Sequence, residues 1–156
     1  MKLSKLQKGF TLIELLVVIA VLAVLATGVL VLIDPVDKIA QANDSKVEND
    51  VGAIGRAAAA YSVTHQGFYP VALSDLVTAG ELRIVPVPPT VSYGTAYTVI
   101  VSPTGCVAGS TCSSFAVGGP YRSKRYTSVV SSSFFRYEAD TGKAPCRIGT
   151  FSLACP

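Results

Sequence analysis

The chain has 156 residues, enough for one compact domain and an appendage. Half of the residues are hydrophobic, and a large share of these lies within the first 33 positions. The formal net charge is +3, which equals the charge of the three lysines that precede the apolar run, Lys2, Lys5 and Lys8. The basic balance is therefore a property of the extreme amino terminus, and it is no argument for nucleic-acid binding.

An apolar run extends from Phe10 to Ile33 and contains one carboxylate, Glu14. Its 24 residues exceed the roughly 20 that a helix needs to span a bilayer. An acid inside such a run marks function by default, because it needs a partner that lipid does not supply. Basic flanks stay cytoplasmic, so the chain after the run is expected to lie outside.

The stretch Lys8-Gly9-Phe10-Thr11-Leu12-Ile13-Glu14, followed by the apolar run, resembles the class III signal of type IV prepilins and of type II secretion pseudopilins. The resemblance implies that prepilin peptidase cuts between Gly9 and Phe10 and methylates the new amine of Phe10. Glu14 then becomes the fifth residue of the mature chain, the position of the family's glutamate. The implied function is that of a pilin, a structural subunit that polymerises into a type IV pilus-like filament.

In such a filament, we expect Glu14 to pair with the amine of Phe10 of a neighbouring subunit and to set the axial register. The alternative is an ion pair between Glu14 and the amine of its own chain. The resemblance also implies the partners: further copies of the chain, prepilin peptidase, inner-membrane assembly machinery, and membrane lipid before assembly. The amino terminus would be cytoplasmic and the head outside the inner membrane, before the subunit enters an extracellular or periplasmic filament.

Three other interpretations compete with the pilin. The first is a pseudopilin of a type II secretion or DNA-uptake system, which carries the same signal. The second is a membrane-anchored binding protein that never polymerises. The third is an ordinary secretory signal, whose apolar core should be shorter and free of charge.

The sequence divides into four parts: a cleaved leader (1–9), a hydrophobic helix (10–33), an amphipathic half of that helix (34–66) and a globular α+β head (67–156). Asp34-Pro35 interrupts the helix, or caps a new one with proline at its first position. Beyond it, apolar residues recur at spacings of four and three, which predicts one buried helix face: Val47, Val51, Ile54, Ala58 and Tyr61. The neighbouring charges mostly fall off this face.

From Ser92 onward the pattern predicts β-strands, because β-branched and aromatic residues alternate with small or polar ones. The candidate strands are residues 96–101, 114–117, 126–130, 134–139 and 149–153, with a turn at 140–142. We expect an antiparallel sheet of three to five strands against the amphipathic half-helix, as the type IV pilin resemblance also implies.

All four cysteines follow the apolar run: Cys106, Cys112, Cys146 and Cys155. An even count in an oxidising compartment implies disulfides, and four cysteines allow three connectivities. We favour nearest-neighbour pairing, Cys106 with Cys112 and Cys146 with Cys155. The second pair resembles the disulfide-bounded loop of type IV pilins, which favours a pilus over a secretion pseudopilus.

No catalytic constellation emerges, so we expect no enzyme, no cofactor and no metal site. His65 is the only histidine and sits near a predicted helix end. Glu138 and Asp140 are candidate calcium ligands, but a hairpin turn explains their spacing better. The basic and aromatic stretch 121–126 was weighed for DNA binding, and a solvated loop or a contact between subunits is the favoured interpretation.

Overall fold

The structure is a computed structural model that describes residues 9–128, 134–142 and 146–148. The elements follow in chain order: α1 (Leu12–Ile33), α2 (Pro35–Thr64), α3 (Leu73–Thr78), the 3-10 helix η1 (Val91–Tyr93), β1 (Thr98–Ser102), β2 (Ser114–Pro120), α4 (Lys124–Thr127), β3 (Phe134–Glu138) and β4 (Cys146–Ile148). The chain forms two compact units, residues 1–38 and residues 39–156. We call the second unit the head.

Helix α1 is apolar all round, as the sequence predicts, and it is the one described helix long and apolar enough to cross a membrane. It ends at Asp34, which adopts a left-handed conformation with φ of 44°. Pro35 is the first residue of α2, where a missing N–H is harmless. The Asp34 Oδ1 atom accepts the N–H of Asp37 at 3.4 Å. Asp34 therefore ends one helix and caps the next, so the two interpretations of Asp34-Pro35 both hold.

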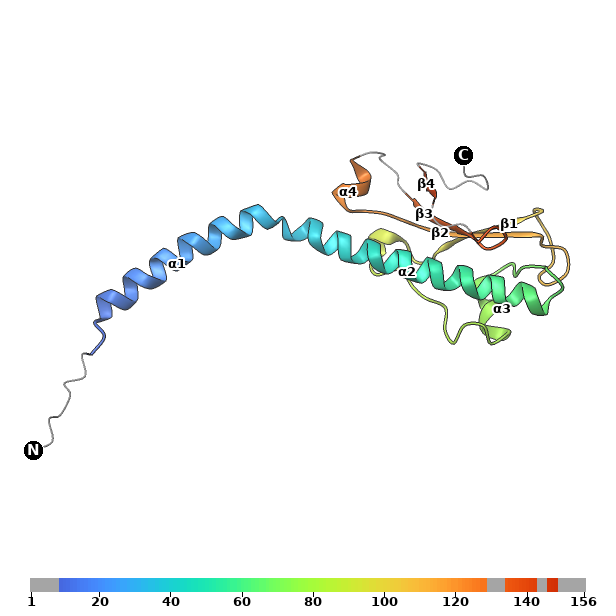
Figure 1. Cartoon of the computed structure of the whole chain (residues 1–156), viewed down its shortest axis with the longest axis horizontal. Helices are drawn as coiled ribbons and strands as arrows, with labels where there is room; N and C mark the ends of the chain where they lie inside the picture. Colours follow the sequence, from blue (N-terminus) through green and yellow to red (C-terminus); the bar gives the residue numbers. More distant parts are fainter. Residues whose placement is uncertain (1–8, 129–133, 143–145, 149–156) are drawn as a thin grey trace, which may run out of the picture. The chain divides into compact units, whose positions relative to one another are not determined.

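Within the head, the sheet lies along one side of α2 (Figure 1). The predicted apolar stripe of α2 is confirmed, because all five of its side chains are buried: Val47, Val51, Ile54, Ala58 and Tyr61. Phe115 and Val117 of β2 belong to the same core. A Cβ atom on Gly55 would lie 2.0 Å from Cδ1 of Tyr137, so only glycine allows α2 to approach β3 this closely.

The sheet is antiparallel throughout, with strand order β1-β2-β3-β4. Val117 of β2 is paired with Val99 of β1 on one side and with Tyr137 of β3 on the other. The chain is thus an α+β protein consistent with the pilin fold, and the predicted fold class is confirmed. The strand edges shift by a few residues, because β1 begins at Thr98 and β2 continues to Pro120.

One predicted strand is wrong in its described part. Residues 124–127 form the short helix α4, in which the N–H groups of Tyr126 and Thr127 bond to the Ser123 carbonyl at 3.1 Å. The N–H of Ser123 is itself held by Asp44 of α2. Tertiary anchoring of this turn overrides the local β propensity. Residues 129–130 and the predicted strand 149–153 lie outside the described residues.

A disulfide joins Cys106 and Cys112, with 5.1 Å between their Cα atoms. The loop that it closes is tied to the segment after α2, because the N–H of Tyr69 donates to the Cys112 carbonyl at 2.8 Å. The N–H of Gly109 returns a bond to the Tyr69 carbonyl at 3.1 Å. The expected pairing of Cys146 with Cys155 lies outside the described residues.

Candidate functional site

Helix α1 begins with three hydrogen bonds between Thr11 and Glu14, which run in both directions. The Thr11 hydroxyl and the Thr11 N–H both donate to Glu14 Oε2, at 2.7 and 2.9 Å. The N–H of Glu14 donates back to the Thr11 hydroxyl oxygen at 3.3 Å. This arrangement is a capping box, in which the first turn of a helix satisfies its own free N–H groups. The sequence argument left Glu14 in need of a partner, and Thr11 is one.

The capping box leaves half of the carboxylate available. Both Thr11 donors meet the same oxygen, Oε2, and within the described residues Glu14 Oε1 accepts no hydrogen bond. Phe10 precedes the cap and its side chain is 77 % exposed, and Gly9 is exposed as well. A cationic donor from outside the chain could therefore reach Oε1 while Thr11 stays in place.

Thr11 was missed as a functional residue although a signal for it was present. A threonine three residues before a glutamate, at the start of an apolar run, is the sequence signature of a capping box. The resemblance to the prepilin signal had drawn attention to Gly9, Phe10 and Glu14 instead. The structure brings Glu14 together with Thr11.

The described surface of α1 is exposed along the whole helix. Its described side chains are all exposed, and the 19-residue segment Leu12–Leu30 has no buried residue. Apolar surface of this extent is unstable in water, so lipid or the helices of other molecules must cover it. An uncovered apolar helix led by a capped acid is thus the principal candidate site.

The prokaryotic N-terminal methylation motif matches residues 4–30, which include the whole capping box. The chain carries the class III signal peptide of type IV pilins and pseudopilins. Comparison with curated proteins and with solved structures gives no significant match.

The methylation motif implies processing by prepilin peptidase and assembly into a pilus-like system. Together with the apolar helix, it fits membrane anchoring before assembly into a surface or periplasmic filament. The chain is accordingly a pilin- or pseudopilin-like precursor. Its motif occupies the first unit, so the head must be understood from its own contacts.

Within the head of this pilin-like precursor, carboxylates of α2 bind the segments that flank the sheet. Asp44 is the most deeply buried of these carboxylates. Only 1 % of Asp44 is exposed. Its Oδ1 atom accepts the hydroxyl of Tyr93 at 2.7 Å and the N–H of Arg122 at 2.9 Å, and its Oδ2 atom accepts the N–H of Ser123 at 3.0 Å. One side chain thus joins two segments that are far apart in sequence.

Glu48 lies one turn further along α2 and binds two tyrosines. Its Oε1 atom accepts the hydroxyl of Tyr121 at 2.6 Å and that of Tyr126 at 3.4 Å. The two rings stack with their centroids 4.0 Å apart, and Tyr121 is only 1 % exposed. A buried ring cannot stack on a base, so Tyr121 has no place in the aromatic part of the DNA hypothesis.

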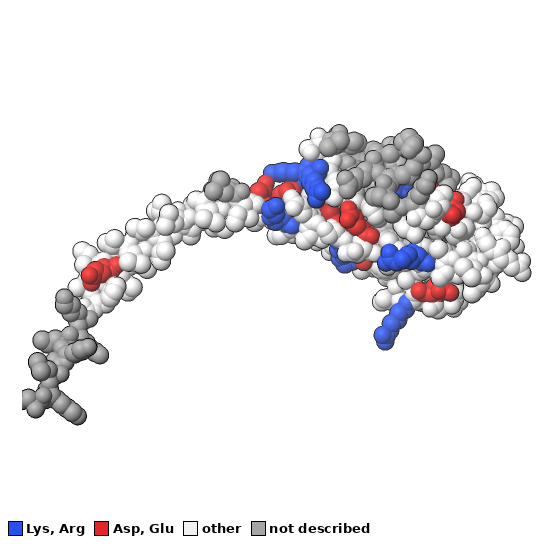
Figure 2. Space-filling view, in the orientation of Figure 1, with Lys and Arg blue, Asp and Glu red and all other residues white. Residues whose placement is uncertain are grey.

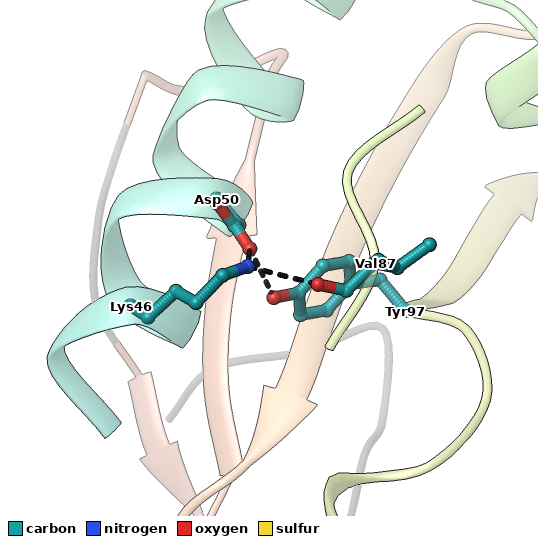
Figure 3. A network of polar contacts seen from close by, with 4 residues as sticks. All are labelled: Lys46, Asp50, Val87 and Tyr97. Carbon is teal, nitrogen blue, oxygen red and sulfur yellow. Dashed lines mark hydrogen bonds and ion pairs between the residues drawn. The ribbon is translucent and has the colours of Figure 1, made fainter. Parts of the chain in front are cut away.

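Asp50 is the third carboxylate of α2 that binds such a segment, and its contacts are shown in Figure 3. It accepts the hydroxyl of Tyr97 at 2.6 Å and forms an ion pair with Lys46. Lys46 Nζ also donates to the backbone carbonyl of Val87 at 2.9 Å, which holds the proline-rich segment against α2. Lys46 and Asp50 lie off the predicted apolar stripe, and they bind segments that flank the sheet.

Burial, together with the hydrogen bond from each hydroxyl to its carboxylate, raises the pKa of Tyr93 and of Tyr97. Loss of the phenolic proton would set a phenolate against Asp44 or Asp50. The Tyr93–Asp44 and Tyr97–Asp50 hydrogen bonds therefore require neutral tyrosines.

The two acids weighed as calcium ligands are engaged by protein groups. Glu138 accepts Nη2 of Arg136 at 2.7 Å through one oxygen and the Thr141 hydroxyl at 3.1 Å through the other. Asp140 accepts the N–H of Thr141 at 3.0 Å. The two bonds of Thr141 belong to the turn predicted at 140–142, whereas Arg136 and Glu138 both lie on β3.

Proposed function

We propose that the chain is a structural filament subunit. Prepilin peptidase cuts it after Gly9 and methylates Phe10, and the mature chain polymerises into a type IV pilus-like filament. The observation that carries this proposal is the exposed apolar surface of α1, most of which lies within the methylation motif. A lone anchor would need the apolar helix, but it would not need the processing signal.

A polar interaction is needed to favour the filament over the membrane. Lipid tails are about as apolar as leucine side chains, so the hydrophobic effect hardly distinguishes a bilayer from a bundle of α1 helices. An ion pair is different, because unlike charges attract strongly at low dielectric and either charge left alone is costly. The amine of Phe10 from a neighbouring subunit forms such an ion pair with Glu14 in the filament.

The capping box is compatible with this ion pair. Thr11 satisfies Oε2 of Glu14 within the monomer, and the neighbour's amine binds Oε1. The subunit therefore does not need to break its own helix cap on entering the filament. The alternative, in which Glu14 binds its own amine, does not align one subunit with the next.

Two measurements test the proposal. Intact-mass analysis of the mature protein should show a chain that begins at Phe10 and carries one extra methyl group. Electron microscopy of sheared surface material should show filaments that contain the chain, whereas material retained in the periplasm would indicate a secretion or DNA-uptake pseudopilus.

The register role has its own variant. Glu14→Val should insert into the membrane normally and form few filaments, while the matched variant Leu15→Val should assemble as the parent does. Unchanged filament yield for Glu14→Val would refute the ion pair. A mature chain that begins anywhere other than Phe10 would refute the proposed function as a whole.

A further inference from the structure

The charged side chains of the head are sorted by sign. Among the acids of residues 39–156 that the structure describes, only Asp140 is exposed. Five of the others bind groups within the head: Asp44, Glu48, Asp50, Asp75 and Glu138. Six bases of the described part of the head are exposed: Lys46, Arg56, Arg83, Arg122, Lys124 and Arg125. The fully exposed charges of this part are therefore mostly positive.

Three of the exposed bases lie together on residues 122–125, which we call the α4 basic turn: Arg122, Lys124 and Arg125. Figure 2 shows Lys and Arg side chains gathered near α4 on the visible face. The backbone of the turn is fixed by Asp44, and the guanidinium of Arg125 lies 5.5 Å from the centre of the Tyr126 ring. The cluster is thus part of an ordered structure.

The α4 basic turn is anchored close to the start of α2. Its anchor, Asp44, is the tenth residue of α2, whereas the disulfide loop bonds to Tyr69, beyond the other end of the helix. The nine residues of α2 before Asp44 span about 14 Å at 1.5 Å per residue. A headgroup layer extends about 5–7 Å beyond the hydrocarbon core, and long basic side chains reach toward such a layer.

We propose that the α4 basic turn docks on anionic lipid headgroups of the membrane in which α1 is anchored. The ligand atoms are phosphate oxygens, which arginine binds with paired hydrogen bonds and lysine binds as a point charge. Anchoring by α1 makes the encounter intramolecular, which raises the effective concentration of headgroups at the turn. Docking concerns the subunit before assembly, so it requires membrane anchoring and not polymerisation.

DNA offers the same phosphate chemistry, but the structure favours the membrane. Tyr121 is buried against Glu48, and the hydroxyl of Tyr126 is turned toward the same carboxylate. These two rings therefore do not form the open stacking platform that single-stranded nucleic acid uses. A lipid surface needs only the exposed cations.

The test uses the full chain in nanodiscs of phosphatidylcholine alone or of phosphatidylcholine with phosphatidylglycerol. Hydrogen exchange of residues 121–128 is followed by mass spectrometry. We expect exchange to slow in the anionic discs, by about fivefold for each basic residue held at the surface. Added salt should remove the difference, because these contacts are exposed and are screened.

A matched pair of variants isolates the turn. Lys124→Gln/Arg125→Gln should lose most of the protection, while Arg56→Gln/Arg83→Gln removes two exposed charges elsewhere on the head and should keep it. Neither pair includes a residue of the methylation motif. Filament yield is scored separately with Glu14→Val, so failure of the docking proposal and failure of the filament proposal give different results.

Three outcomes overturn the docking proposal. The first is equal exchange of residues 121–128 in the two kinds of disc. The second is protection by short DNA with none by phosphatidylglycerol discs, which would identify a nucleic-acid surface. The third is full protection by inorganic phosphate in phosphatidylcholine discs, which would identify a phosphate site that needs no anionic membrane.

Discussion

Thr11 donates its hydroxyl and its N–H to a single oxygen of Glu14, at 2.7 and 2.9 Å, where α1 begins. Removing a capping hydroxyl costs about 1 kcal/mol, which corresponds to roughly a fivefold change in the opening of the first turn. We expect Thr11→Ala to accelerate amide exchange at Glu14 about fivefold in micelles, measured by NMR. Thr11→Ser keeps the hydroxyl and should exchange at nearly the parent rate. Equal rates in both variants would show that the cap contributes nothing.

Asp44 satisfies three donors in the interior of the head, so its loss should be severe. Each donor left buried without a partner costs about 1–3 kcal/mol, and we expect Asp44→Ala to lower the free energy of unfolding of the head by about 3–5 kcal/mol. Urea unfolding in detergent micelles, followed by tyrosine fluorescence, measures the change. Ser45→Ala, at the exposed neighbouring position, should change stability by less than about 0.5 kcal/mol. A similar loss in both variants would contradict the role of Asp44.

Two glycines of α2 separate helix propensity from packing. At Gly52 the nearest atom to an added Cβ is the flexible end of Arg56, at 3.3 Å, so Gly52→Ala should stabilise the head by up to about 1 kcal/mol. At Gly55 the added Cβ would lie 2.0 Å from the ring of Tyr137, and overpacking typically costs about 1–3 kcal/mol. Thermal unfolding of the two variants should therefore shift in opposite directions. Stabilisation by Gly55→Ala would show that β3 can move away from α2.

The raised pKa values of Tyr93 and Tyr97 predict a loss of stability in alkali. An unfolded tyrosine releases its proton near pH 10, whereas the folded head holds both protons to higher pH. Stability is thus fully present below about pH 10 and falls above it, by about 1.4 kcal/mol per pH unit for each tyrosine. Urea unfolding between pH 8 and pH 12 measures the slope. Tyr93→Phe/Tyr97→Phe should be less stable at neutral pH and flatter in alkali, and an unchanged slope would contradict the assignment.

The disulfide closes a short loop, so its contribution should be moderate. With a sequence separation of 6, the chain-entropy estimate is about 2 kcal/mol. Cys106→Ala/Cys112→Ala should lower the free energy of unfolding by about that amount, plus the effect of a small cavity at the buried Cys112. The variant should still fold, because the stripe of α2 and the sheet remain. Failure to fold would mean that the loop is needed to order the end of α2.

Patterns within a few residues of one another were enough to predict much of the architecture. The stripe from Val47 to Tyr61 follows the helical period, and the strands around Val99, Val117 and Phe135 follow local β propensity. The capping box of Thr11 and Glu14 was equally local, and its signature stood in the sequence. It was overlooked because Glu14 was considered only as a partner for an amine.

The hydrogen bonds between the acids of α2 and distant segments of the head could not be predicted in the same way. The bonds of Asp44 to Tyr93 and Ser123 join residues 49 and 79 positions apart, and periodicity contains no information about such pairs. The charges of α2 fall off the apolar face by pattern, but the pattern does not show that its acids bind distant tyrosines or that Asp44 is buried. Residues 126–127 of α4 were predicted as the start of a strand for the same reason, since the conformation of this turn depends on a distant carboxylate.

The long sequence separation of the Asp44 contacts affects folding during synthesis. Asp44 emerges early from the ribosome, but its last donor is 79 positions further along the chain. Contacts of such high order form late, because the intervening loop must close before they stabilise anything. A chain halted before position 123 keeps an unsatisfied acid where the interior should be. The head is therefore completed only after residue 123 has been released, and shorter nascent chains remain open to proteases.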